Sequence, residues 1–148
     1  MSRKLLKNYD LFDFDRTLID NDTLYGFYLA CNNKNIPLFK RLSYLVIRIL
    51  NYFNIISNTQ FKKLGVKLFL AGQSKSKINF ISSKYAKSLK LNKLYYKKFK
   101  KSKNKVVITA SFENYVKKVF EKDKVIVFGS SLLYDETNVV IGLKANLY

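Results

Sequence analysis

Two aspartates, Asp13 and Asp15, stand two positions apart in the stretch LFDFDRTLID at residues 11–20. On an extended segment, side chains two positions apart project from the same face. Two carboxylates about 5 Å apart repel each other by roughly 3 kcal/mol at an effective dielectric of about 20. A divalent cation removes this repulsion, and hard oxygen ligands favour Mg²⁺. The pair therefore predicts a carboxylate site in which Asp13 and Asp15 bind magnesium.

The acidic residues of the chain are confined to two regions. The chain has 28 Lys and Arg against 10 Asp and Glu, a net charge of +18, and no acid from Thr23 to Phe112. Solvated loop residues or helix caps are the simpler interpretation of clustered acids, and we favour it for Asp20 and Asp22. It fits Asp13 poorly, because Asp is disfavoured inside an apolar strand.

The composition excludes several kinds of chemistry. The chain of 148 residues contains no His and one Cys, Cys31. Imidazole acid-base catalysis, Ser-His and Cys-His nucleophiles and a zinc site are therefore not expected. An enzyme of this composition must use carboxylates, hydroxyls, Lys or Tyr. The single Cys fits a reducing compartment, and no apolar run typical of a signal peptide precedes the first acid, so we expect a cytoplasmic location.

Three short apolar runs predict strands at residues 9–14, 105–111 and 124–130. A helical pattern lies between the last two runs, with Ser111 as its expected N-cap. A strand, a helix and a strand at this spacing form a βαβ unit with parallel strands. Residues 131–142 predict a hairpin around a polar turn at 135–138.

The acid-free segment predicts helices instead. Asp22 is expected to cap a helix over 23–32, and Pro37 to open one over 37–53. SNTQ at 57–60 is a capping-box pattern for a helix that Gly72 would terminate, and Ser74 starts a last long helix broken near residue 90. The chain is thus predicted to have an α/β core at 1–21 and 104–148, with a helical insert at 22–103.

Within this insert, the segment 38–56 is apolar but carries Lys40, Arg41 and Arg48. A membrane-spanning helix needs about 20 mostly uncharged residues, so an amphipathic cap helix or an interfacial helix is expected instead. We expect the apolar positions of this segment to form the core of the insert rather than to contact lipid: Leu42, Leu45, Val46, Ile49 and Phe53.

The many basic residues of the insert have three possible explanations. They could steer a small phosphorylated substrate toward the acidic site. The lysine-rich run at 97–105, with Tyr95, Tyr96 and Phe99 among its lysines, could bind an anionic membrane surface or, less readily, nucleic acid. The simplest explanation is a solvated helix face.

These residues carry a resemblance to a known family. FDFDRTLIDNDT resembles the first motif of the haloacid dehalogenase-like (HAD) hydrolase superfamily, an apolar strand followed by D-x-D-x-T. VVITAS followed by a helix is similar to its second motif. Helices filling the interval between the motifs resemble the phosphoserine-phosphatase-like branch. The resemblance implies a Rossmann-like parallel sheet with a helical cap inserted after the first strand.

The resemblance also implies a Mg²⁺-dependent phosphomonoester hydrolase. Asp13 would be the nucleophile that forms an aspartyl-phosphate, and Asp15 would act as general acid and base. Thr17 would stabilise the loop. Thr109 would bind a phosphoryl oxygen together with neighbouring backbone amides, that of Ala110 included.

The sequence departs from the family pattern at two places. Arg16 stands where the family usually has Gly. The Lys and the further acids of the family's later motifs have no clear match, since Lys144 comes too early and Asp135 and Glu136 fall in the expected hairpin turn. The core is therefore expected to be truncated at its C-terminal side. An alternative is an inactive relative whose basic insert binds polyanions or an anionic membrane surface.

Overall fold

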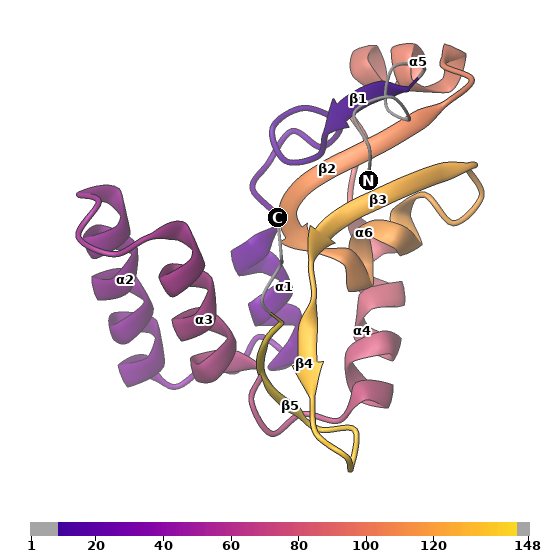
Figure 1. The fold of residues 1–148 in the computed structure, drawn as a ribbon. Coiled ribbons are helices and arrows are strands. Elements are labelled where there is room, and N and C mark those ends of the chain that lie inside the picture. Colours follow the sequence, from indigo (N-terminus) through magenta and orange to yellow (C-terminus); the bar gives the residue numbers. More distant parts are fainter. Residues whose placement is uncertain (1–8, 145–148) are drawn as a thin grey trace. The chain divides into compact units, whose positions relative to one another are not determined.

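The computed structural model describes residues 9–144 (Figure 1). Its elements confirm the predicted α/β class, with strands that flank a run of helices. The bounds along the chain are β1 Asp10–Asp13, α1 Leu24–Cys31, α2 Leu38–Tyr52, α3 Asn58–Phe69, α4 Lys75–Ser88, α5 Lys93–Lys101, β2 Lys105–Phe112, α6 Glu113–Val119, β3 Val125–Ser130, β4 Leu132–Tyr134 and β5 Val140–Leu143.

The strands β1, β2 and β3 form a parallel sheet in that order, as Figure 1 shows. Phe12 of β1 aligns with Val107 of β2, which aligns with Val127 of β3. Apolar residues run through β2 and β3, as is usual for a parallel sheet with covered faces. β1 lies at an edge of this sheet among the described residues, and its Leu11 is exposed.

Aromatic side chains form the core beside this sheet. Phe99 of α5 meets Phe12 edge to face at 5.1 Å and Phe120 at 4.9 Å between ring centroids. Phe14, which follows β1, lies 5.9 Å from Phe120 and 6.3 Å from Tyr115 of α6. Such pairs add about 0.5–1.5 kcal/mol each beyond their burial. The cluster joins β1, α5 and α6 and so supports the strand that ends in Asp13.

The N-cap of helix α6 lies one residue after the expected one. Its N-cap is Phe112, which makes no side-chain hydrogen bond to the helix. The prediction that Ser111 caps this helix is wrong, because Ser111 still belongs to β2 and its hydroxyl binds Asp15 instead.

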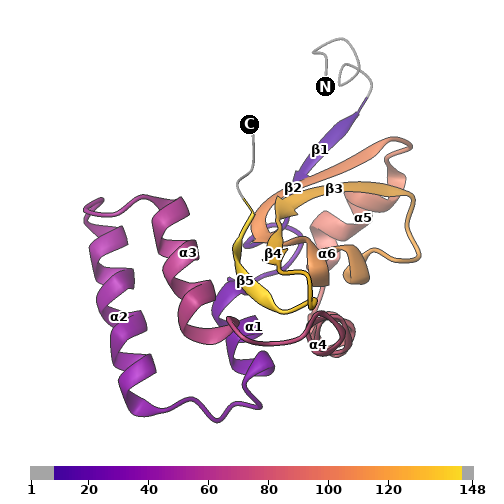
Figure 2. The same cartoon turned by 60° about the horizontal axis from the view of Figure 1, so that its bottom comes forward.

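The helices α1, α2 and α3 pack around a second aromatic cluster. Tyr44 of α2 stacks on Tyr25 at 4.9 Å, and Phe69 of α3 stacks on Tyr28 at 4.9 Å. Figure 2 shows α2 and α3 side by side. The hairpin of β4 and β5 contacts α3 and is antiparallel as predicted, with its turn at 135–138.

Local signals set several of the helix ends as expected. Ser57 and Gln60 form the predicted capping box at the start of α3. Asp22 accepts a hydrogen bond from the amide of Leu24, and Asn92 caps α5 after the predicted break near residue 90. Short polar side chains at these positions satisfy amides that have no partner within the helix.

The expectation that the apolar positions of α2 form a core is wrong. These side chains are exposed, namely Leu42, Leu45, Val46, Ile49 and Phe53. Their helical spacing predicts that they share one side of the helix, but spacing alone does not tell what that side faces. No helix among the described residues is long and apolar enough to cross a membrane.

The described chain divides into two compact units. One contains residues 9–24 and 82–130, and the other contains residues 25–81 and 131–144. The first holds the parallel sheet with α5 and α6. The second joins the hairpin to the helices α1, α2 and α3. The division into a core and a cap at residues 22 and 103 stays a prediction.

Candidate functional site

The two aspartates lie at the carboxyl end of β1, in the unit that contains the sheet. Asp13 is the last residue of the strand and is exposed. Its Oδ1 accepts a hydrogen bond from the amide of Phe14 at 2.8 Å, and its Oδ2 one from the hydroxyl of Thr17 at 3.3 Å. Thr17 therefore orients the Asp13 carboxylate and leaves it open to solvent. Ligands of open parallel sheets bind at this end of the strands.

The loop after β1 turns sharply at Arg16, whose φ of 58° lies in the left-handed region. The amide of Ile19 closes the turn on the carbonyl of Phe14 at 2.9 Å. A non-Gly residue in this conformation costs about 1–2 kcal/mol. The conformation explains why Gly is usual at this position in the family that the motif resembles. Here the chain adopts it with Arg.

Asp15 is held by four hydrogen bonds. Its Oδ1 accepts from the amide of Thr23 at 2.8 Å and from the Thr23 hydroxyl at 2.7 Å. Its Oδ2 accepts from the hydroxyls of Ser111 at 2.6 Å and Thr109 at 3.4 Å. Hydrogen bonds to an ionised acceptor are stronger than neutral ones. Asp15 therefore has one fixed orientation, toward the end of β2.

A buried layer of hydroxyls supports these contacts. The Thr23 hydroxyl lies 2.7 Å from the Tyr115 hydroxyl and 3.1 Å from that of Ser111. Because the single hydroxyl hydrogen of Thr23 points to Asp15, Tyr115 is the donor in their bond. Burial raises the pKa of Tyr115 well above its usual range, hydrogen bonds with Ser111 and Thr23 lower it, and the charge of Asp15 raises it. Tyr115 therefore remains a donor.

Of the two residues expected to bind phosphate, Thr109 lies at the site. Its hydroxyl oxygen accepts from the amide of Ser111 at 3.0 Å while its hydrogen points to Asp15. Ala110 is exposed, and its carbonyl accepts from the hydroxyl of Ser130 at 2.7 Å. The register between β2 and β3 shifts between Ile108 and Phe112. Beside this irregularity, three consecutive residues face different neighbours. Thr109 and Ser111 contact Asp15, whereas Ala110 between them contacts Ser130.

Gly129 allows β3 to approach the site closely. A Cβ atom at Gly129 would lie 2.7 Å from the carbonyl oxygen of Ser111 and 3.2 Å from Cγ2 of Thr109. The amide of Gly129 donates to Oε1 of Glu113 at 3.1 Å. Only a residue without a side chain fits here, so Gly129 allows β3 to lie close to the end of β2, which carries Thr109 and Ser111.

Three residues of the site were not predicted as site residues from the sequence: Thr23, Ser111 and Tyr115. Ser111 is the last polar residue of an apolar strand, and that position was a usable signal. Thr23 and Tyr115 reach Asp15 or its partners only through the folded chain, because 92 positions separate them from each other.

A cavity of about 480 Å³ lies beside Thr23 in the same unit. Its lining combines carboxylates with polar and basic groups: Ile19, Asp20, Asn21, Asp22, Thr23, Tyr85, Ser88, Leu89 and Lys90. The hydroxyl of Tyr85 donates to the carbonyl of Thr23 at 2.8 Å. Thr23 therefore both lines this cavity and binds the carboxylate of Asp15.

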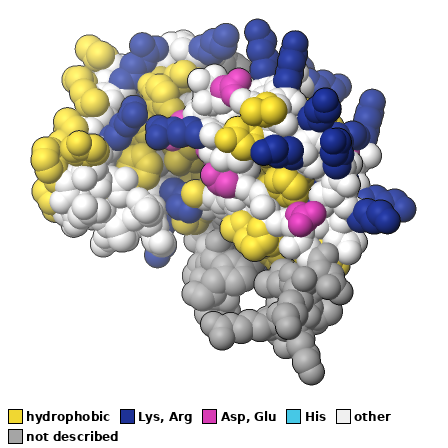
Figure 3. Space-filling view, turned by 90° about the horizontal axis from the view of Figure 1, so that it is seen from above, with side chains coloured by type: hydrophobic (Ala, Val, Ile, Leu, Met, Phe, Trp, Pro, Cys, Tyr) yellow, Lys and Arg dark blue, Asp and Glu magenta, His cyan; other side chains and the backbone are white. Residues whose placement is uncertain are grey.

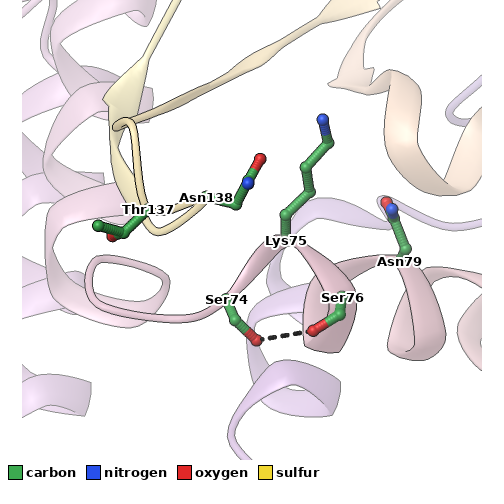
Figure 4. A pocket seen from close by; sticks show the side chains of 6 residues that line it. All are labelled: Ser74, Lys75, Ser76, Asn79, Thr137 and Asn138. Atoms are coloured by element: carbon green, nitrogen blue, oxygen red, sulfur yellow. Dashed lines mark hydrogen bonds between the residues drawn. The ribbon is translucent and has the colours of Figure 1, made fainter.

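Another cavity, of about 460 Å³, lies in the second unit at the start of α4 (Figure 4). It is lined by Ser74, Lys75, Ser76, Asn79, Thr137 and Asn138. The hydroxyls of Ser74 and Ser76 bind each other at 3.1 Å, as the dashed line in Figure 4 marks. None of the residues predicted to do chemistry lines it.

The oxygen donors at the end of β1 fit Mg²⁺. This ion binds through one or two carboxylates and keeps several waters, and the exposed Asp13 carboxylate meets that requirement. Within residues 9–144, no group of three or more His, Cys, Asp or Glu side chains converges on one point. A magnesium ion would therefore depend on Asp13, Asp15, water and a substrate phosphate.

The fold identifies the class of protein that this chain resembles. Solved structures with this fold include HAD-family hydrolases and phosphoserine phosphatases, which confirms the predicted resemblance. No protein-family profile and no curated protein matches the sequence. The likeness to these proteins is therefore found by comparing structures and not by comparing sequences.

Three of these structures illustrate the match. A Bordetella pertussis Tohama I protein of unknown function has a TM-score of 0.74 at 14% identity, covering 90% of this chain and 65% of its own. A HAD family hydrolase from Salmonella enterica serovar Typhi has a TM-score of 0.62 at 14% identity, and the match covers 89% of this chain and 43% of that protein. A phosphoserine phosphatase with a phospho-aspartyl intermediate analogue has a TM-score of 0.62 at 22% identity, and the match covers 92% of this chain and 63% of that protein. The chain thus spans less than two thirds of the length of each of these three structures.

Proposed function

We propose that this chain is a Mg²⁺-dependent phosphomonoester hydrolase that acts through an aspartyl-phosphate on Asp13. The observation that carries the proposal is the arrangement at the ends of β1 and β2, where an open carboxylate, Asp13, lies two positions from a carboxylate fixed by four hydrogen bonds, Asp15. The fold shared with phosphoserine phosphatases supports the same reaction class. The substrate would be a small phosphorylated molecule.

In the first step, a carboxylate oxygen of Asp13 attacks phosphorus, and the bond from phosphorus to the leaving oxygen breaks. Asp15 gives its proton to that oxygen, so the alcohol leaves neutral. In the second step, water attacks the phosphorus of the aspartyl-phosphate, and Asp15 takes a proton from the water. Inorganic phosphate leaves and the Asp13 carboxylate is restored.

The partners of Asp15 indicate which of its oxygens carries the proton. Oδ1 faces the amide of Thr23, which can only donate. Oδ2 faces hydroxyls of Ser111 and Thr109, which can rotate and accept instead. A proton on Asp15 would therefore be carried by Oδ2, and one of the two hydroxyls would turn to accept it.

The end of β2 would hold the transferred phosphate. The Thr109 hydroxyl, which contacts Asp15, would turn toward a phosphoryl oxygen, and the backbone amide of Ala110 would bind another. A magnesium ion held by the Asp13 carboxylate and the Asp15 backbone carbonyl would neutralise charge on the phosphate. The basic residues of the chain, 28 Lys and Arg in all, would raise the local concentration of phosphorylated substrates.

The test is release of p-nitrophenolate from p-nitrophenyl phosphate by the full chain, with Mg²⁺ and after chelation. We expect Mg²⁺-dependent turnover that Asp13→Asn abolishes and Asp15→Asn lowers by a factor of about 100 or more. Asp10→Asn is the matched control, since Asp10 is an exposed acid of the same strand and should keep full activity. Equal turnover by Asp13→Asn, or none by the unaltered chain, contradicts the proposal.

A further inference from the structure

The helix α2 exposes an apolar side to solvent. Of its residues, all of which are described, Tyr44 alone is buried. Leu38 is 71% exposed and Tyr52 is 80% exposed. The exposed apolar residues of the helix and of the segment after it, here termed the α2 stripe, are Leu38, Phe39, Leu42, Leu45, Val46, Ile49, Tyr52, Phe53 and Ile55. An amphipathic helix in a soluble protein usually turns such a side inward.

The stripe points away from the packed side of the helix. Successive residues of an α-helix rotate by about 100° around its axis, so Leu38, Leu42, Leu45, Ile49 and Tyr52 share one side. Tyr44 lies on another side, where it contacts Tyr25, Tyr28, Phe61 and Phe69. In Figure 3, hydrophobic side chains gather at the left, the side on which Figure 1 draws α2, with Lys and Arg beside them.

Two arginines mark the border of the stripe. Arg41 and Arg48 are seven positions apart, so they lie above each other beside Leu45. Together with Tyr25, Tyr44 and Leu45 they line a cavity of about 200 Å³. The Nε atom of Arg41 donates to the carbonyl of Ile36 at 3.0 Å, which helps to hold its guanidinium. Guanidinium groups bind phosphate in a planar, two-point geometry.

We propose that α2 lies flat on an anionic lipid surface, with its stripe among the acyl chains and a lipid phosphate between Arg41 and Arg48. Charge favours this occupant, because the chain has no acid from Thr23 to Phe112. A second copy placed on the same face would bring both pairs of arginines together in repulsion. The helix has 15 residues and three basic side chains, which suits the interface and not the interior of a bilayer.

This inference is independent of catalysis at Asp13 and concerns a different unit of the chain. It adds a location to the proposed activity, since an interfacial helix would bring the chain to substrates at a membrane. Burial of the apolar stripe in the membrane should contribute binding energy that high salt leaves largely intact. The arginines should contribute electrostatic binding energy that high salt weakens.

The experiment is co-sedimentation of the full chain with vesicles of phosphatidylcholine, alone or mixed with phosphatidylglycerol. We expect binding to the mixed vesicles that falls at least about tenfold in Leu42→Asn/Ile49→Asn, because two buried apolar side chains are lost from the membrane. Arg41→Gln/Arg48→Gln should lower binding about thirtyfold on mixed vesicles and little on neutral ones. All four side chains are exposed in the fold, so the variants should remain folded.

Leu94→Asn is the matched control, because Leu94 is an exposed leucine of the lysine-rich helix α5. Its binding should equal that of the unaltered chain. Equal binding by Leu42→Asn/Ile49→Asn overturns the proposal, as does the absence of binding to mixed vesicles. A dimer in solution that the stripe variant dissociates would assign the stripe to a second copy and also overturn it.

Discussion

The hydroxyl of Ser111 donates to Oδ2 of Asp15 across 2.6 Å, although the two residues are 96 positions apart in the chain. This bond fastens the end of β2 to the loop that follows β1. It also lies in a largely buried layer, where a hydroxyl and a carboxylate both need a partner.

Ser111→Ala should lower the free energy of unfolding by about 1.5–3 kcal/mol, because a hydrogen bond to a charged group is lost. Ser130→Ala is the matched comparison, since the Ser130 hydroxyl donates to a neutral carbonyl, that of Ala110, at 2.7 Å. We expect a smaller loss for it, about 0.5–1.5 kcal/mol. Urea denaturation of both variants decides the point, and a larger loss in Ser130→Ala would contradict the stronger hydrogen bond assigned to Ser111.

Gly129→Ala should destabilise the sheet and disturb the site. The added Cβ would meet the carbonyl oxygen of Ser111 at 2.7 Å, and backbone atoms cannot move aside cheaply. A loss of about 1–3 kcal/mol is expected on thermal or urea unfolding. Gly142→Ala provides the control, because nothing lies within 4 Å of a Cβ there. Similar stability of the two variants would refute the close approach of β3.

Cys31 should be unreactive toward thiol reagents in the folded chain. Burial raises the pKa of its thiol to about 12, and the nearby charge of Lys77 opposes this in part. Since the thiolate is the reactive form, its fraction at neutral pH falls about a thousandfold relative to an ordinary Cys. Reaction with Ellman's reagent should be slow until urea unfolds the protein. Rapid labelling under native conditions would show that α1 opens readily.

The hairpin turn should lose stability in acid because of Asp135. Its carboxylate accepts from the amides of Val139 and Thr137, each at 2.9 Å, and from the Thr137 hydroxyl at 2.8 Å. Chiefly the Val139 amide, then the Thr137 hydroxyl, hold the pKa of Asp135 below its usual value. Because the pKa of Asp135 is lower in the folded chain than in the unfolded chain, its carboxylate stabilises the fold above the ordinary Asp pKa of about 3.9. This stabilisation is lost as the pH falls through the lowered pKa of the folded chain.

Asp135→Ala makes this contribution measurable. The difference in unfolding free energy between the unaltered chain and Asp135→Ala should be constant near neutral pH and shrink as pH falls below about 4. Comparison of the two chains at each pH cancels the titration of the other acids. A difference that grows in acid would contradict the assigned role of the carboxylate.

The sequence predicts those parts of the fold that depend on local signals. The apolar runs of β1, β2 and β3 and the capping box at Ser57 and Gln60 act over a few residues, so they are readable without the structure. The pairing of Asp13 and Asp15 at the end of a strand is readable for the same reason. Their type and spacing predict a carboxylate site there.

Long-range features of the chain are not readable in this way. Ser111 lies within the register shift between Ile108 and Phe112, which no local pattern specifies. The packing of Phe99 on Phe12 ties α5 to the sheet, although α5 falls within the predicted insert. The outward direction of the α2 stripe depends on which side of α2 meets α3.

The parallel pairing of β1 with β2, which aligns Asp10 with Lys105, also has a consequence for how the protein folds. The two strands cannot meet until a long intervening loop has closed, and the entropy of that closure slows folding. During synthesis β1 leaves the ribosome well before its partner, and translation of the intervening residues takes about 5–20 s at usual elongation rates. For that interval Leu11 and Phe12 remain unpaired, which makes the nascent strand a natural target for a chaperone.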